Sequence, residues 1–404
     1  RSARLRPIMS DEFIPLAIPN ITEAEGANLQ KCIETTFVST VGEFVVEFEE
    51  RVAKLSGTYF EPDSNLGSCG GVAMGAGTMA LHMALHGNNI GQGDLVICPS
   101  FTFIASANSI RHANARPWLF DVSPDSWTID TKQVAEALKT KTHRDSEGVL
   151  RHTESGDRVA AIMPVYTLGT PADMEEIIAL SKDYGLPIIA DAAAAIGVDY
   201  KGKPIGDMAD FTCYSFNGNK TITSGGGGMV VGRDRAIMNR IKHVSTTARV
   251  WPNYDHDEVG YNYRMTNIEA AVGCAQLDRL EDFVAAKQKI RRTYDEQFAD
   301  VAGISAFPYP DDRGSTCWFS GFVVEDDSLP TPEEICAKLG EQRIQARIFW
   351  KPVHLQVPYA DTPMEPCPYS ESVYDRIVTL PCSTQLTDAQ QARVIQAVKE
   401  ILAA

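Results

Sequence analysis

Short apolar runs alternate with stretches of helical periodicity through the first part of the chain. The apolar runs predict buried strands at residues 95–99, 117–122, 160–165, 187–191, 211–216 and 229–232. Between them, apolar residues recur at helical spacing at 101–111, 130–138 and 172–184. Strands that alternate with helices in this way predict an α/β fold with a mostly parallel sheet flanked by helices.

The rest of the chain has a different pattern. Residues 267–298 carry an apolar stripe at helical spacing and predict one long helix that joins a large domain to a smaller one. A strand at 318–324 and helices at 331–341 and 388–402 predict a small C-terminal α+β domain. We therefore expect a large domain at 9–285 and a small domain at 286–404.

Three further segments are not expected to contribute to the core. Residues 1–8 precede Met9, which can serve as a natural start, and we expect them to be a cloning remnant or a disordered tail. The polar stretches 61–71 and 139–157 have few large apolar residues and are expected to be surface loops.

The composition argues against several classes of function. The 404 residues include 37 Lys and Arg against 53 Asp and Glu, which gives a formal net charge of −16. A chain this acidic, without a basic run, is a poor ligand for nucleic acids and anionic membranes. The nine cysteines are widely spaced and form no CxxC pair, which argues against a disulfide framework and a zinc site. We expect a cytoplasmic protein without a metal, nucleic-acid or membrane partner.

Three residues at expected strand ends and helix starts carry candidate chemistry. Asp191 ends an apolar run, where a carboxylate is costly unless it meets a cation; the alternative is a helix N-cap. Lys220 follows the strand at 211–216 and precedes four glycines; the alternative is an ordinary solvated lysine. Thr78 follows Gly77 at an expected helix start, whose free N–H groups would bind phosphate unless Thr78 is only an N-cap.

Together these features match what pyridoxal phosphate (PLP) needs. A lysine amine can bond to its aldehyde, a carboxylate can keep its pyridine nitrogen protonated, and a helix start can hold its phosphate. The chain resembles the PLP-dependent sugar-nucleotide aminotransferases of the DegT/StrS family, which have fold type I. The segments that carry the resemblance are FIPLAIPN at 13–20, GTMALHMAL at 77–85, PSFTFIA at 99–105, IADAAAAIG at 189–197, YSFNGNKTITSGGGGM at 214–229 and GYNYRMTNIEAA at 260–271.

The resemblance implies roles for the residues that match the family's motifs. Lys220 would attach the cofactor and later move a proton between the substrate carbon and the cofactor. Asp191 would pair with the pyridine nitrogen, and Phe103 would stack on the ring. The residues expected to hold the phosphate are Gly77, Thr78 and Ser215.

Other matching residues imply a shared site. Asn262 and Arg264 resemble cofactor and substrate contacts that the family donates from a partner subunit, which implies a homodimer with shared active sites. His354 resembles a position near the substrate, although a lone histidine is more often structural.

The resemblance also implies a reaction. L-Glutamate would give its amine to the cofactor, which would pass it to a keto sugar nucleotide. The segments FVSTVG at 37–42, SFNGNK at 215–220 and DHDEVGYNYR at 255–264 are most similar to enzymes that aminate C4 of UDP-linked 4-keto-6-deoxy-N-acetyl sugars. Those enzymes make UDP-4-amino sugars for bacillosamine- or legionaminic-type glycans, so we expect a role in surface glycan or O-antigen synthesis. Another keto sugar nucleotide, GDP- or dTDP-linked and aminated at C3 or C4, stays open.

The chain departs from the family pattern at four positions. Ala194 stands where relatives carry a polar residue near the cofactor's phenolic oxygen, and Gly226 stands where they often carry Glu. Tyr166 and Leu168 replace a common His and Tyr. Ala194 leaves open a non-catalytic sensor that binds PLP or a sugar nucleotide. Lys220 argues against the related sugar dehydratases, which carry His at its position.

Overall fold

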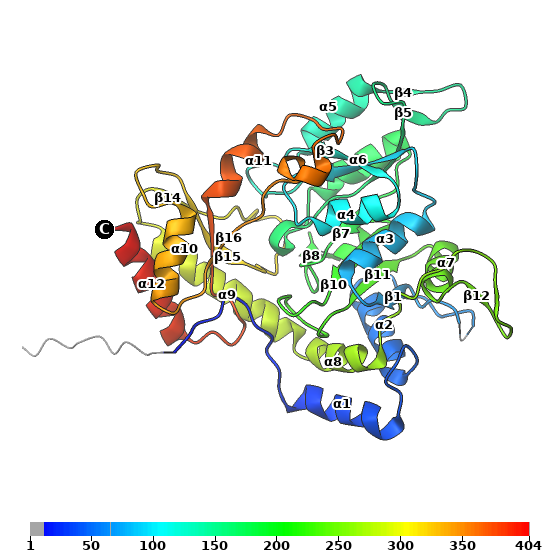
Figure 1. The fold of residues 1–404 in the computed structure, drawn as a ribbon, viewed down its shortest axis with the longest axis horizontal. Helices are drawn as coiled ribbons and strands as arrows, with labels where there is room; N and C mark the ends of the chain where they lie inside the picture. Colours follow the sequence, from blue (N-terminus) through cyan, green and yellow to red (C-terminus); the bar gives the residue numbers. More distant parts are fainter. Residues whose placement is uncertain (1–11, 65, 404) are drawn as a thin grey trace, which may run out of the picture.

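The computed structural model describes residues 12–64 and 66–403, so the tail or remnant expected at 1–8 lies outside the described residues. The large domain is built on one mixed sheet (Figure 1). One part has the strand order β3 (Arg116–Phe120), β2 (Asp94–Pro99) and β6 (Arg158–Ile162) and continues into the hairpin described below. The other part has the order β7 (Ile189–Asp191), β10 (Phe211–Ser215), β11 (Gly228–Gly232) and β1 (Gly71–Met74).

The direction of these strands confirms the predicted α/β class. The pairs β2–β3, β2–β6 and β7–β10 are parallel, and parallel bridges join residues 162 and 165 beside β6 to the β7 region. Strand β11 runs antiparallel to both β10 and β1. The central strands therefore end at a common edge, where α/β folds bind their ligands.

Helices cover both faces of the sheet because side chains alternate along each strand. In β2, Leu95 and Ile97 face one apolar cluster, whereas Val96 and Cys98 face the other. The helices of the first cluster are α2 (Glu43–Leu55), α5 (Thr131–Lys141), α6 (Met174–Tyr184) and α8 (Asn267–Leu277). Those of the second are α3 (Gly77–Gly87), α4 (Ala105–His112) and α7 (Arg235–Ser245). Helix α1 (Glu23–Thr35) lies outside them, against α8.

The C-terminal part forms a second core at the opposite end of the molecule from α7 (Figure 1). Its antiparallel sheet has the order β14 (Ile304–Ala306), β15 (Ser320–Val324), β17 (Ile377–Leu380) and β16 (Arg347–Ile348). Helices α9 (Leu280–Phe298), α10 (Pro332–Glu341) and α12 (Asp388–Leu402) pack on it. The N-terminal residues Ile14 and Leu16 are buried in the same core. The division at residue 285 stays a prediction.

The remaining elements are short. They are β8 (Asp199–Tyr200), β9 (Lys203–Pro204), β12 (Arg249–Val250), β13 (Asp255–His256), α11 (Pro368–Val373) and 3₁₀ turns at Thr167–Gly169, Ile205–Asp207, Val353–Leu355, Val357–Tyr359 and Tyr374–Arg376. The hairpin of β12 and β13 projects beside α7 (Figure 1).

The prediction of one helix at 267–298 was wrong, because α8 and α9 are separate helices. Arg279 leaves helical geometry, with φ −116° and ψ 11°. Its guanidinium donates to Glu25 and to the carbonyl oxygen of Asn20. The chain bends where this arginine reaches the N-terminal segment, a distant contact that periodicity does not reveal.

The prediction of a loop at 139–157 was also wrong. Helix α5 extends to Lys141, and a hairpin of β4 (Thr142–Arg144) and β5 (Leu150–His152) follows. The Asp145 carboxylate accepts the backbone N–H groups of Glu147 and Val149 and so holds the turn. Polar bonds stabilise this hairpin. Its strands were not predicted because its sequence lacks the apolar alternation that indicates strands.

Candidate active site

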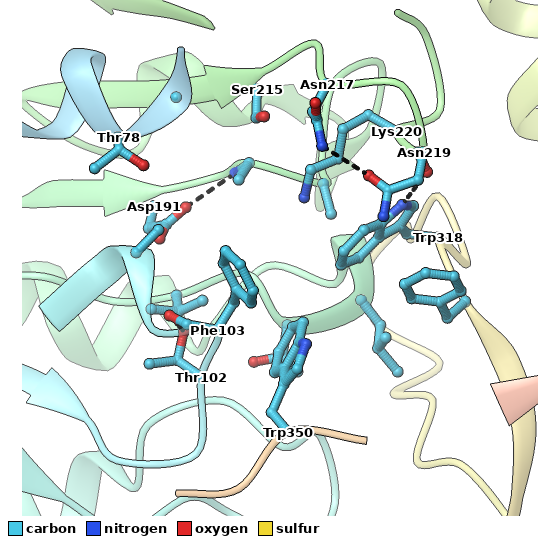
Figure 2. Close-up of a pocket in the computed structure, with 18 of the residues that line it drawn as sticks. Thr78, Thr102, Phe103, Asp191, Ser215, Asn217, Asn219, Lys220, Trp318 and Trp350 are labelled. Atoms are coloured by element: carbon cyan, nitrogen blue, oxygen red, sulfur yellow. Dashed lines mark hydrogen bonds between the residues drawn. The ribbon is translucent and has the colours of Figure 1, made fainter. Parts of the chain in front are cut away.

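A cavity of about 450 Å³ lies at the carboxyl ends of β7 and β10, beside the first turn of α3 (Figure 2). Six of the residues predicted for the site line it: Gly77, Thr78, Phe103, Asp191, Ser215 and Lys220. In Figure 2, Thr78 and Asp191 lie toward one end, and Lys220 lies toward the other, next to Trp318.

Asp191 presents a buried carboxylate to this cavity. The Ser106 hydroxyl donates to its Oδ2 at 2.6 Å, and the Ala193 N–H donates to its Oδ1 at 3.1 Å. Burial raises the pKa of Asp191 above its usual value, and these two bonds and the charge of Lys220 oppose the rise. Residues 192–198 form no helix, so the N-cap alternative is wrong. The carboxylate is suited to a cationic partner such as a protonated pyridine nitrogen.

Lys220 lies in the turn after β10, with its amine inside the site. Its Nζ is 3.6 Å from the centre of the Trp318 ring. Burial lowers the pKa of Lys220 from 10.5 to about 8, and the charge of Asp191 opposes that shift. The solvated-lysine alternative is therefore wrong. An amine with this pKa has a substantial neutral fraction near neutral pH, which nucleophilic attack and proton abstraction require.

The start of α3 offers donors for an anion. Its N-cap is Ala76, whose side chain caps nothing, so the first N–H groups of the helix lack intrahelical partners. Thr78 lies inside the helix, so the N-cap alternative is wrong for it as well. A Cβ on Gly77 would lie 2.8 Å from the Cβ of Ser215, so glycine allows the Ser215 hydroxyl to approach the helix start. This cradle fits a phosphate group.

The far wall of the cavity comes from the small domain, and the sequence reasoning missed it. The Trp350 ring lies 4.2 Å from that of Phe349 and 6.1 Å from those of Phe103 and Trp318, measured between ring centres. Aromatic residues at 318–319 and 349–350 look like core residues in the sequence, and no local motif marks them. Phe103 keeps 53% of its surface exposed, so a ring face is available in the cavity.

Two polar residues of the lysine turn also line the cavity without having been predicted. They are Asn217 and Asn219, and the Asn217 amide donates to Asn219 Oδ1 at 3.5 Å. Both lie within the segment that carried the resemblance, so their positions were visible there, whereas their orientation into the cavity was not.

Asn262 and Arg264 do not line this cavity. Asn262 is exposed, and its backbone bridges to Thr246. The Arg264 side chain is 8% exposed, and its Nη1 donates to Glu49 Oε1 at 2.5 Å and to the Ala73 carbonyl oxygen at 3.1 Å. Arg264 is thus paired within its own subunit, whereas Asn262 is exposed.

His354 lies outside the cavity lining too. Its Nδ1 is 2.6 Å from the Ser100 hydroxyl, and its Nε2 is 3.1 Å from Glu371 Oε1. Its side chain is 5% exposed. Both ring nitrogens therefore have partners within the chain, as expected for a structural histidine.

The structure shows the surroundings of two positions that depart from the family pattern, 194 and 226. Ala194 lines the cavity and, as an alanine, offers no polar side chain there. Its carbonyl oxygen accepts the Thr316 hydroxyl at 2.7 Å. A Cβ on Gly226 would lie 3.2 Å from Glu269 Oε1. A side chain at 226 would therefore need the Glu269 carboxylate to move by a few tenths of an ångström.

The described residues contain no helix long and apolar enough to cross a membrane. Within the same residues, no three His, Cys, Asp or Glu side chains are arranged to hold a metal ion.

A lysine amine, a buried carboxylate and an uncapped helix start meet at the carboxyl ends of β7 and β10. This donor set fits PLP: Asp191 faces a cation site, the α3 start faces an anion site, and Lys220 supplies the amine. The fold and site define a PLP-dependent transferase of fold type I.

Comparison with known proteins identifies the family. Residues 19–399 match the model of the DegT/DnrJ/EryC1/StrS aminotransferase family, and the chain belongs to that family. It is 33% identical to the GDP-perosamine synthase of Caulobacter vibrioides, over 96% of this chain and 98% of that protein. It is 29% identical to the UDP-N-acetyl-3-dehydro-alpha-D-glucosamine 3-aminotransferase of Acidithiobacillus ferrooxidans, over 82% and 84%. The crystal structure of a family member from Brucella abortus has a TM-score of 0.83 and 28% identity, covering 95% and 96%.

These findings confirm the predicted family, fold, cofactor and enzyme class. The protein is a PLP-dependent sugar aminotransferase.

Proposed function

We propose that the enzyme transfers an amino group from L-glutamate to the C4 keto group of a nucleotide-linked 4-keto-6-deoxy sugar. The proposed substrate is UDP-2-acetamido-2,6-dideoxy-4-keto-hexose, and the product is a UDP-4-amino sugar for surface glycans such as O-antigen. The observation that carries transamination is the cavity in which Lys220, with a pKa of about 8, faces Asp191 and the uncapped start of α3. The motif similarities at 37–42, 215–220 and 255–264 support the UDP-linked sugar.

Each residue of the cavity has a distinct task in this proposal. Bound PLP supplies an aldehyde for the donor amine and a ring that accepts the electron pair of the broken C–H bond. Asp191 keeps a positive charge at the far end of that ring, while Phe103 offers a face for stacking. The α3 start binds the phosphate together with the hydroxyls of Thr78 and Ser215.

Lys220 is the group that moves protons. Its neutral amine removes the proton from the α-carbon of glutamate in the first half of the reaction. The ammonium would deliver that proton to the cofactor, and in the second half the amine would move a proton from the cofactor to C4 of the sugar. A pKa of about 8 suits both directions, because neither form is scarce near neutral pH.

A second candidate is the same reaction on a GDP-linked sugar. The observation that favours it is the 33% identity with a GDP-perosamine synthase over almost the whole of both chains. The Acidithiobacillus relative is named for a UDP-linked sugar and for C3. The nucleotide and the ring position of the amino group thus vary among the relatives, and the substrate test should vary both.

We also propose a homodimer in which Asn262 reaches the cavity of the partner subunit. Asn262 is exposed and lies outside its own cavity. Large apolar side chains are exposed in the flanking hairpin and in the α1–α2 connection: Phe37, Val41, Trp251, Tyr254 and Val259. Exposed apolar groups of this kind mark protein interfaces.

The cytoplasm is the compartment we propose. All nine cysteines are unpaired, and eight of them are buried. Free thiols in this number suit a reducing environment.

The substrate test follows the visible absorbance of the bound cofactor in stopped flow. Glutamate should bleach the band, and the UDP-linked 4-keto sugar should restore it faster than its GDP- and dTDP-linked counterparts. Faster recovery with the GDP-linked sugar would select the second candidate. A band that glutamate does not bleach would support a sensor instead of an enzyme.

The dimer test mixes two inactive variants, Lys220→Ala and Asn262→Ala. If sites are shared, mixed dimers contain one cavity with both native residues, so activity should return toward a quarter of the wild-type value on random exchange. Absence of recovery, with exchange verified by mass spectrometry, would place both residues in one subunit's site.

A further inference from the structure

The Trp318 ring lies beside the reactive amine of Lys220, and the proposed reaction assigns it no role. It lies two residues before the small-domain strand β15 and is 4% exposed, yet it lines the cavity. The Nζ of Lys220 stands 3.6 Å from the ring centre (Figure 2). A cation at this distance from an indole face is attracted to it, and more strongly when water is excluded.

The ring is fixed relative to the lysine turn. Its Nε1–H donates to the carbonyl oxygen of Asn219 at 2.6 Å, and Asn219 immediately precedes Lys220 in the chain. The ring also packs against Phe319, with centres 4.3 Å apart. A movement of the indole would therefore displace the turn that carries the amine.

The backbone of Trp318 is fixed as well. Lys287 of helix α9 donates from Nζ to the carbonyl oxygens of Trp318 and Cys382, both at 3.0 Å. Lys287 is 2% exposed, and no carboxylate of the described residues lies within 4.0 Å of its Nζ. These carbonyl oxygens are therefore its acceptors, and a buried ammonium would be costly without them.

A purely structural tryptophan would account for the burial and for the N–H bond. It would not require the amine to lie on the ring face. An aliphatic side chain of similar bulk would fill that space, whereas only an aromatic face attracts the ammonium while still accommodating the neutral amine. The amine alternates between these two forms in the reaction proposed above.

We propose that Trp318 is a positioning residue that holds the Lys220 amine on its indole face whenever the amine is not bonded to the cofactor. This inference rests on the proposed function of Lys220 and adds a residue from the other domain to it. The small domain thereby fixes the position of the unbonded Lys220 amine, through the bonds of Trp318 to Asn219 and Lys287.

The test measures how fast the cofactor-free protein captures PLP covalently between pH 6 and 10, by absorbance. Capture needs the neutral amine, so the midpoint of the profile reports the titration of Lys220.

Trp318→Leu keeps apolar bulk and removes the π face, which stabilises the ammonium. We expect its midpoint to fall by about half a unit. We also expect its plateau rate at high pH to fall about three- to tenfold, because the amine is less well placed. Trp318→Phe should keep the midpoint close to that of the wild type.

A difluorotryptophan at position 318 provides a version that preserves shape. Fluorine weakens the π face, so the midpoint should fall with little change in the plateau, even if the leucine variant does not fold. Trp350→Leu is the matched comparison, because its ring lines the same cavity without lying on the amine. We expect no shift of its midpoint. Equal midpoints for wild type, leucine and difluorotryptophan would overturn the inference.

A control separates this inference from the proposed function. Lys220→Ala should show no covalent capture at any pH. If that variant captures PLP and turns over normally, the proposed function fails. If it is inactive and the Trp318 variants titrate like the wild type, only the role of Trp318 fails.

Discussion

The two walls of the cavity are encoded differently in the chain. On the large-domain wall, Asp191 ends a strand, Lys220 follows one, and Thr78 lies in the first turn of a helix. On the small-domain wall, Trp318 and Trp350 come from separate segments that meet only through packing. The first wall has the groups of the proposed chemistry, and the second is mainly aromatic. The difference indicates that chemistry and positioning are divided between the domains.

The largest effect is expected on the large-domain wall. Lys220→Ala should lower kcat by at least about 10³-fold, because no other amine in the cavity can attach the cofactor or move the proton. Cofactor absorbance and glutamate-dependent turnover measure this directly. Lys220→Arg is the matched control, since it keeps a charge without a usable neutral form, and it should be equally inactive. Wild-type turnover in either variant would remove the residue from the mechanism.

A smaller loss is expected at Asp191. Asp191→Asn keeps the shape and removes the negative charge, so kcat should fall by about 10²–10³-fold while PLP still binds. Single-turnover rates with glutamate, compared with the retained cofactor absorbance, separate these two properties. If the rate is retained in the asparagine variant, the carboxylate is not the partner of the pyridine nitrogen.

The difference between the two walls also decides which features of the fold and the site can be predicted from the sequence. Strand ends such as Asp191 are visible because apolar runs and the carboxylate that ends them are adjacent in sequence. The bend at Arg279 was missed because its partners lie more than 250 residues away. Ser106, which donates to Asp191 across 85 residues, was missed for the same reason.

The small-domain wall was missed for another physical reason. A buried aromatic residue has the same local pattern whether it fills a core or lines a cavity. Trp318 is distinguished only by the amine on its face, a contact between residues almost a hundred positions apart. For His354, similarity to a family motif predicts a place near the substrate, and the contacts across 254 and 17 residues that fix its ring on Ser100 and Glu371 were not visible in the sequence.

A pH profile sharpens the comparison at Lys220. Because burial lowers its pKa from 10.5 to about 8, the neutral fraction rises from about a tenth at pH 7 to about nine tenths at pH 9. The rate of the glutamate half-reaction should therefore rise roughly tenfold over this interval and then level off. Stopped-flow absorbance at saturating glutamate measures it. A rate that is flat from pH 7 to 9 would contradict proton abstraction by this amine.

Ser106 tests the support beneath Asp191. Its hydroxyl donates to the buried carboxylate at 2.6 Å and lowers the pKa of Asp191 against the effect of burial. Ser106→Ala should raise that pKa, so the ionised form is lost at higher pH and the acid limb of activity moves upward. The pH profile of the glutamate half-reaction measures this upward movement of the acid limb. Ser109→Ala, which removes a hydroxyl bonded to the Ser106 carbonyl oxygen, is the control.

The smallest catalytic effect is expected at His354, outside both walls. Its ring bonds to Ser100 on one side and to Glu371 on the other, so it connects the segment after Trp350 to the end of β2. His354→Ala should lower the free energy of unfolding by about 1–2 kcal/mol and change kcat/KM for the sugar less than threefold. Denaturant unfolding and steady-state kinetics measure the two effects, and Ser100→Ala should reproduce the loss of stability. If instead KM for the sugar rises tenfold while stability is unchanged, His354 binds substrate, and the small domain contributes recognition as well as positioning.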